Sequence, residues 1–303
     1  MNLTDSVKDV GFPEASEDVR FSYSRPEQHW FKRGLIRAIE MATGQPMLER
    51  FYRDWATRPR EGENIFSAGV RLLGINIISN AEAWADVPRE GPLLVIANHP
   101  YGVIDGMALG HLMTRIRPDT KIMTHSLLCQ PPQARPYLLP VDFGGTPEAR
   151  QTSLLTRKRA QEWLAAGHCV AIFPAGSVSA TQSPFGGVAL DTPWYAFTAK
   201  LARQDGLKVL PLYFHGQNSM LFHMATHSYY PFRIALLFRE SVRRMGTNLK
   251  VTVGTPIASE DLPHNQGREA VLKELRRRTY ALSGFDHPGM ERDFAWPQHV
   301  ATN

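Results

Sequence analysis

A histidine and an aspartate close together in the sequence are the residues best suited to chemistry. In the segment VIANHPYGVIDGMALG, an apolar run ends at Asn98 and His99, and Asp105 follows after a proline and a glycine. A carboxylate beside one imidazole nitrogen fixes the tautomer and makes the other nitrogen a better base. Such a pair removes a proton from a hydroxyl or an amine that attacks an acyl group. The alternative is structural, with Asp105 as a helix cap and His99 as a polar strand end.

The neighbouring residues predict the elements that position this pair. Residues 93–97 (LLVIA) predict a buried strand, and a helix is expected to begin near Asp105. His99 would then lie at the carboxyl edge of a sheet, where open α/β sheets bind ligands. Pro100 and Gly102 would bend the loop, so that the carboxylate reaches the ring.

Strand-like runs alternate with helical patterns along most of the chain. The predicted strands are 75–79, 93–97, 121–125, 137–142, 169–173, 208–214 and 250–254. The predicted helices are 105–116, 147–166, 191–204 and 268–283, with two more in the stretches 27–44 and 47–56. This alternation predicts an α/β fold with a mostly parallel, buried sheet flanked by helices.

The composition bounds the class of protein. The chain has 303 residues, of which 43% are hydrophobic, and a formal net charge of +5. Such a charge suits a polyanion, but no nucleic-acid-binding signature is present, and we expect no nucleic-acid partner. Cys129 and Cys169 are too few and too far apart for a disulfide scaffold or a zinc site, and we expect no metal. No apolar run reaches eighteen residues, which leaves peripheral contact as the expected relation to a membrane.

Three motifs in order resemble those of a known superfamily. NHPYGVIDG is followed by FPAGSVS and then by VLPLYFHGQNS. Over about residues 70 to 260 the chain resembles the lysophospholipid acyltransferase superfamily (glycerol-3-phosphate acyltransferase-like), and within it the branch of hemolysin-like and lyso-ornithine lipid O-acyltransferases. The usual signature of the superfamily places four residues between its histidine and aspartate. Here five separate His99 from Asp105, as in the NHPxGxxDG form of this branch.

The resemblance implies a reaction and its partners. His99 would be the general base and Asp105 the group that orients it. The acceptor would be a lysolipid hydroxyl, with lyso-ornithine lipid favoured and 1-acylglycerol-3-phosphate (lysophosphatidic acid) as the close alternative. The acyl donor would be a thioester on acyl carrier protein or coenzyme A, with no further cofactor. We expect an enzyme of membrane lipid biosynthesis, cytoplasmic and peripheral on the inner face of the cytoplasmic membrane.

The same resemblance suggests substrate-binding residues in each motif. These candidates are Asn98, Gly102, Phe173, Pro174, Gly176, Ser177 and Asn218. Ser177 departs from the family, which commonly has a glutamate in this loop (FPEG, or FPAGEVS in this branch). Asp191 and Trp194 in DTPWYAF also match the branch.

A basic helix supplies a further candidate. Gly144 and Gly145 precede a predicted helix that carries several cations, and the corresponding block in relatives binds the polar head group of the acceptor. We favour Arg150, which lies nearest the glycine turn, because an arginine fork suits phosphate or carboxylate. The alternative is a solvated helix face.

Two basic segments are candidates for surface contacts. The helix around HWFKRGLIRAI combines Trp30 and Phe31 with cations, as a helix in a membrane interface does, although packing on the core explains the pattern equally well. A second cluster would attract acidic acyl carrier protein or lipid head groups. It comprises Arg233, Arg239, Arg243, Arg244 and Lys250.

Two other functions stay open at this point. A serine esterase would use Ser177 or Ser179, but AGSVS lacks the second glycine of the G-x-S-x-G elbow. A catalytically weakened membrane-binding protein would explain the missing glutamate, although the chain keeps Asn98, His99 and Asp105.

We divide the chain into four parts. Residues 1–20 are predicted to be a flexible leader, 21–62 an N-terminal helical extension, 63–284 the acyltransferase domain, and 285–303 a loosely ordered tail.

Overall fold

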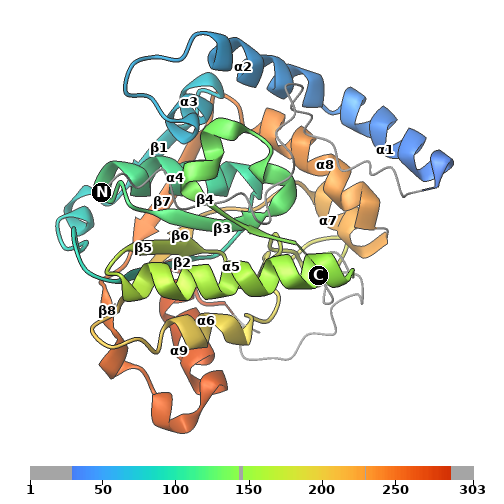
Figure 1. Cartoon of the computed structure of the whole chain (residues 1–303). Coiled ribbons are helices and arrows are strands. Elements are labelled where there is room, and N and C mark those ends of the chain that lie inside the picture. Colours follow the sequence, from blue (N-terminus) through green and yellow to red (C-terminus); the bar gives the residue numbers. More distant parts are fainter. Residues whose placement is uncertain (1–28, 143–145, 229, 288–303) are drawn as a thin grey trace.

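A central sheet of eight strands lies between two layers of helices (Figure 1). The computed structural model describes residues 29–142, 146–228 and 230–287, so the predicted leader and most of the predicted tail lie outside the described residues. The strands are β1 Asn76–Ser79, β2 Leu93–Ala97, β3 Lys121–His125, β4 Leu138–Val141, β5 Cys169–Ile172, β6 Lys208–Phe214, β7 Asn248–Val253 and β8 Ile257–Ala258. The helices are α1 Trp30–Ala42, α2 Gln45–Thr57, α3 Ile65–Leu72, α4 Val103–Ile116, α5 Pro147–Ala165, α6 Ala196–Leu201, α7 Met220–Ser228, α8 Tyr230–Arg243 and α9 Arg268–Ala281.

The sheet is mostly parallel, as predicted. Its strand order is β1-β7-β6-β2-β5-β3-β4, with β8 paired to β6. Every pairing is parallel except those of β6 with β7 and with β8. Strand β2 pairs with both β5 and β6, which puts it in the middle of the sheet. The carboxyl ends of these three neighbouring strands therefore meet at one edge, where the predicted motifs follow them.

Both faces of β2 are buried, and this explains its continuous apolar run. Leu93, Val95 and Ala97 belong to the core under α3 and α4. Leu94 and Ile96 face the opposite core, to which α5, α6 and α9 contribute. Because successive side chains of a strand point to opposite faces, a strand covered on both sides needs apolar residues at every position.

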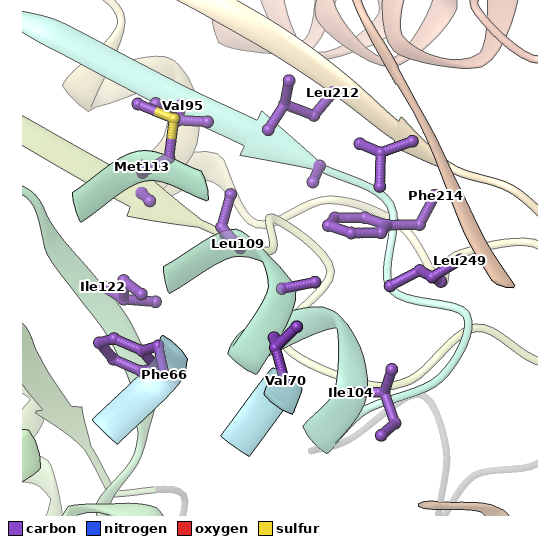
Figure 2. Close-up of a cluster of buried hydrophobic side chains, with 14 of the residues drawn as sticks. Phe66, Val70, Val95, Ile104, Leu109, Met113, Ile122, Leu212, Phe214 and Leu249 are labelled. Atoms are coloured by element: carbon purple, nitrogen blue, oxygen red, sulfur yellow. The ribbon is translucent and has the colours of Figure 1, made fainter. Parts of the chain in front are cut away.

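Helices α3 and α4 are packed closely against the sheet. Figure 2 shows Phe66 of α3 next to Ile122 of β3, and Met113 of α4 next to Val95 of β2. A Cβ on Gly110 of α4 would lie only 2.4 Å from the Phe66 ring. The missing side chain at that position therefore lets the two helices approach, and α4 is held firmly where it begins beside β2.

Two expectations about helices need correction. Helix α6 is much shorter than the predicted 191–204, because Asp191 is held in an extended segment by contacts with other loops. The sequence analysis predicted no helix between 215 and 243, yet α7 and α8 occupy most of that stretch.

The N-terminal extension is helical, as predicted. Trp30 and Phe31 of α1 are exposed, and among the α1 side chains that the structure describes Ile36 and Glu40 are buried. Helix α1 packs on α8, and α2 packs on α3. The extension is therefore part of the layer that covers one face of the sheet.

Candidate active site

The predicted pair lies at the carboxyl edge of the sheet. His99 follows β2, and Asp105 is in the first turn of α4. The His99 Nδ1 atom lies 3.1 Å from Oδ2 of Asp105, which also accepts the backbone amides of Tyr101 (2.6 Å) and Gly102 (3.0 Å). With Nδ1 facing the carboxylate, Nε2 is the nitrogen left to take a proton.

Burial affects the two partners differently. Asp105 is fully buried, whereas the His99 side chain is 17% exposed. Burial raises the pKa of Asp105, and the His99 ring and the two amides oppose that rise. A buried carboxylate gains most from a positive charge beside it, and His99 carries that charge once it has accepted a proton.

Gly102 makes the turn between these residues. It has a φ of +72°, a conformation that side chains disfavour. A Cβ there would lie 3.1 Å from Leu237 of α8 and 3.2 Å from Val178. The loop that carries His99 is thus enclosed by α8 on one side and the FPAGSVS loop on the other.

The FPAGSVS loop contacts the histidine directly. The Phe173 ring stacks on the His99 ring with a centroid distance of 3.9 Å and an interplanar angle of 22°. Gly176 has a φ of +65°, and the Ser177 hydroxyl lies 3.1 Å from the hydroxyl of Thr192. The loop therefore supports the base and presents a neutral hydroxyl, rather than a carboxylate, next to it.

Asp191 ties these loops together. One of its carboxylate oxygens accepts the backbone amide of His99 (3.2 Å) and the hydroxyl of Ser179 (2.6 Å), and the other accepts the Trp194 indole (3.0 Å). Its own amide donates to the Tyr280 hydroxyl of α9 at 2.8 Å. Asp191 and Trp194 were known from the sequence only as a motif match, and their positioning role comes from contacts between distant segments.

Neither of the two asparagine candidates lines the cavity described below. Asn98 is buried and binds Phe214 twice, donating to its carbonyl (2.9 Å) and accepting its amide (2.7 Å). It therefore joins the His99 loop to the end of β6. Asn218 is also buried, and its side-chain amide has no hydrogen-bond partner among the described residues.

A cavity of about 680 Å³ opens beside the pair. Its lining includes His99, Gly102 and four residues of the FPAGSVS loop that were predicted to bind substrate, namely Phe173, Pro174, Gly176 and Ser177. Most of the remaining lining is apolar. It includes Leu48, Phe51 and Trp55 of α2, Ile65, Phe66 and Leu72 of α3, and Met107 of α4. Such a lining suits a hydrocarbon chain, and it shows that the N-terminal extension helps to form the site.

The arginine predicted to bind the head group is not among the residues that line the cavity. Arg150 is exposed in the first turn of α5 and does not line the cavity, whereas Arg157 of the same helix does. Arg157 lies over the Phe197 ring at 5.5 Å. Gly144 and Gly145 lie outside the described residues.

Arg233 of α8 also lines the cavity and is 2% exposed, so it does not belong to the predicted surface cluster. Sequence reasoning missed this role because it identified no helix there. The sequence pattern that could have predicted it is FRIALLF. Its apolar residues flank Arg233, as on a helix that turns this face toward the core.

Two kinds of feature are absent from the described residues. No helix among them is both long and apolar enough to traverse a bilayer. Within the same residues, no group of three histidine, cysteine or acidic side chains is arranged to hold a metal ion.

Comparison with curated proteins found related enzymes. A lyso-glycine lipid O-acyltransferase of Phocaeicola vulgatus is 23% identical over 235 residues, which cover 75% of this chain and 80% of that protein. A lyso-glycine lipid O-acyltransferase of Bacteroides thetaiotaomicron is 27% identical over 179 residues, covering 57% of this chain and 63% of that protein.

Comparison with solved structures and family models adds two findings. The crystal structure of the 1-acyl-sn-glycerophosphate (LPA) acyltransferase PlsC from Thermotoga maritima aligns with a TM-score of 0.39 and 14% identity, covering 85% of this chain and 90% of that one. The model of a family described as Acyltransferase matches residues 25–286, which include the N-terminal helices as well as the three motifs. The match to the family model confirms the resemblance to the lysophospholipid acyltransferase superfamily. Because the match spans most of its length, the chain belongs to this family and is an acyltransferase.

Proposed function

We propose that this acyltransferase moves a fatty acyl group from a thioester to the hydroxyl of a lysolipid. His99, oriented by Asp105, takes the hydroxyl proton while the oxygen attacks the thioester carbonyl. The tetrahedral intermediate then expels the thiolate, which takes the proton back from the His99 imidazolium. The observation that carries the proposal is the buried His99–Asp105 contact at the wall of a large apolar cavity.

The oxyanion of the intermediate needs hydrogen-bond donors near His99. The amides of His99, Tyr101, Gly102 and Gly176 already donate within the protein. The amides of Ser177 and Val178 donate to no acceptor within the part of the chain that the structure describes, and both residues line the cavity. We assign oxyanion stabilisation to these two amides.

The acceptor that we favour is an amino-acid lysolipid. The motifs resemble those of lyso-ornithine lipid O-acyltransferases, and both curated relatives act on lyso-glycine lipid by name. Lyso-ornithine lipid stays our first choice, with lyso-glycine lipid beside it and lysophosphatidic acid as the alternative. Acyl carrier protein and coenzyme A thioesters are both proposed donors, and no metal or further cofactor takes part in the proposed reaction.

The serine esterase is less well supported by the geometry. The Ser177 hydroxyl contacts Thr192, and the Ser179 hydroxyl is buried and donates to Asp191. Neither serine hydroxyl has a hydrogen bond to a histidine ring within the described residues, so neither has the base that a nucleophilic serine needs. A catalytically weakened binding protein is disfavoured by the contact between His99 and Asp105.

We also propose peripheral contact with the cytoplasmic face of the membrane. The support is the exposed apolar end of α1, where Trp30 and Phe31 lie close in the sequence to the half-buried Arg33 and the exposed Arg37. Rings beside cations suit a membrane interface with anionic lipid.

The proposed reaction is tested with wild type and His99→Ala. Each is given acyl carrier protein and coenzyme A thioesters with lyso-ornithine lipid, lyso-glycine lipid or lysophosphatidic acid, and thiol release and the acylated product are measured. We expect transfer by wild type and a loss of about 10²- to 10⁴-fold in kcat for His99→Ala, the usual contribution of a general base.

The matched control is His168→Ala. His168 faces Asp119 at the same 3.1 Å but does not line the cavity, so its removal should leave kcat unchanged. Full activity of folded His99→Ala would exclude the proposed mechanism. No transfer by wild type to any of the lysolipids would exclude the proposed reaction.

A further inference from the structure

The wall of the cavity carries a buried cation that acyl transfer, as described, does not use. Arg233 of α8 donates from Nη2 to the carbonyl of Val178, and its guanidinium lies 5.6 Å from the Phe222 ring. It lines the cavity together with His99. The helix, the carbonyl and the ring thus hold the guanidinium in a set position.

That position is close to the catalytic loop. Arg233 contacts Val178, which follows Ser177 in the FPAGSVS loop and packs beside Gly102. Leu237, the next residue on the same face of α8 four positions later, also packs beside Gly102. The side of α8 that carries Arg233 is therefore the side that encloses the loop holding His99.

The cavity offers positive charge and no carboxylate. Among the described residues that line it, none is an aspartate or a glutamate, and Arg157 is the other arginine. Ser177 beside Val178 is neutral. The acid of α8, Glu240, points to Arg239, Arg243 and Ser219 instead.

The histidine near Arg233 adds no compensating charge. Burial and the Arg233 charge lower the pKa of His223 to about 4, so this ring is neutral at neutral pH. An apolar cavity with guanidinium groups and no acid is suited to a ligand with an anionic group, because a guanidinium binds carboxylate or phosphate with two parallel hydrogen bonds.

We propose that Arg233 binds the acidic group of the acceptor lysolipid, a carboxylate or a phosphate, and thereby selects acidic acceptors. This inference rests on the proposed lysolipid acyl transfer. The bound anion would lie between α8 and the FPAGSVS loop, and the acceptor hydroxyl would then face His99.

The test compares acidic acceptors with neutral counterparts of the same chain length. Lyso-glycine lipid is paired with its carboxyl methyl ester and lysophosphatidic acid with monoacylglycerol, because the methyl ester of lyso-ornithine lipid would still carry a cationic side-chain amine. For Arg233→Gln we expect kcat/KM to fall by about 10- to 100-fold with the acidic acceptors, mostly through KM, the range of a lost charged hydrogen bond. The neutral acceptors should change far less, and Arg233→Lys should recover part of the loss. Whether the carboxylate pair or the phosphate pair responds identifies the anion.

Two further variants guard against a purely structural effect. Ser177→Glu keeps Arg233 and adds a carboxylate to the wall of the same cavity, so it should lower the acidic-to-neutral activity ratio in the same direction. Arg243→Gln on the same helix is exposed and outside the cavity, and it should leave the ratio unchanged. If Arg233→Gln does not fold, the Ser177→Glu ratio decides.

The outcomes separate the two proposals. An equal loss with acidic and neutral acceptors, or an unchanged ratio in both Arg233→Gln and Ser177→Glu, overturns the role of Arg233 and leaves the lysolipid reaction intact. No transfer by wild type to any acceptor overturns both.

Discussion

The His99 ring is held on several sides before a substrate arrives. Asp105 faces its Nδ1 atom, and Phe173 stacks on its plane. Its backbone amide donates to Asp191, and its carbonyl accepts the Ser179 amide at 2.8 Å. A base fixed in this way needs little reorganisation when the acceptor hydroxyl reaches it, which favours proton transfer in the transition state.

His168 shows that a short distance to a carboxylate is not sufficient to place a histidine at the cavity. The Asp119 carboxylate lies 3.1 Å from His168, but it also binds the buried Arg117 with both oxygens. Arg117 donates in addition to the carbonyls of Gly91 and Gly167. That cluster joins three loops, and neither member of its His–Asp pair lines the cavity.

The two pairs allow a matched test of the carboxylate. Asp105→Asn keeps the size of the side chain but removes the charge that favours the Nδ1–H tautomer and stabilises the imidazolium. We expect kcat to fall by about 10²- to 10⁴-fold with KM little changed, as for loss of general-base catalysis. The readout is initial-rate kinetics of thiol release.

The control for this change is Asp119→Asn. It should lower thermal stability through Arg117 but leave kcat near that of wild type. A similar fall in kcat for both variants would show that Asp105 acts through the fold rather than on His99.

At the scale of elements, α9 does not line the cavity but stabilises the site through hydrogen bonds to Asp191. Its Tyr280 hydroxyl accepts the Asp191 amide, and Arg276 of the same helix donates to the Asp191 carbonyl at 2.7 Å. Asp191 in turn holds the His99 and Ser179 segments. A C-terminal helix is thus connected to the base through one buried residue.

This connection predicts that removal of the Tyr280 hydroxyl, although distant from His99 in the sequence, lowers the stability of the protein. Tyr280→Phe leaves the buried Asp191 amide without its acceptor, and we expect it to lower the free energy of unfolding by about 1 to 3 kcal/mol. The measurement is urea denaturation followed by circular dichroism, with kcat determined in parallel.

Tyr213→Phe is the matched control. Its ring packs against Tyr280 at 5.6 Å, but its hydroxyl makes no hydrogen bond within the described residues, so little change is expected. Equal stability of both variants would contradict the importance of the Tyr280–Asp191 bond.

At the scale of the whole molecule, the exposed apolar side chains of α1 are separated from those on the far layer of helices. Trp30 (74% exposed) and Phe31 (63%) are in α1, which lies with α8 and α7 on one side of the sheet (Figure 1). The exposed Leu154 of α5 (64%) lies in the opposite layer. Helices of the α1 side, including α2 and α8, line much of the cavity, and Arg157 of α5 lines it from the opposite layer.

Trp30→Ala combined with Phe31→Ala is therefore expected to weaken binding to vesicles that contain anionic phospholipid. Burying each ring in the interface contributes about 1.5 kcal/mol, so the double variant should lose about 3 kcal/mol and bind roughly 100-fold more weakly. Vesicle co-sedimentation measures this directly. Leu154→Ala should bind as wild type does, and unchanged binding of the double variant would place the contact on another surface.

The local pattern was sufficient to predict the elements that carry the catalytic pair. An apolar run long enough for a strand ends at His99, and a helix begins just before Asp105, so the two residues had to meet at the sheet edge. The alternating elements likewise predicted the parallel sheet, because buried strands and helices have different apolar periods. These properties depend on residues that are neighbours in the chain.

Only the tertiary structure decided which other side chains reach the cavity. Arg150 is exposed, whereas Arg157 and the buried Arg233 line the wall, because helix packing turns one face inward. Asp191 holds the His99 loop through segments as distant as Tyr280. Contacts of this kind join residues far apart in sequence, and no local spacing encodes them.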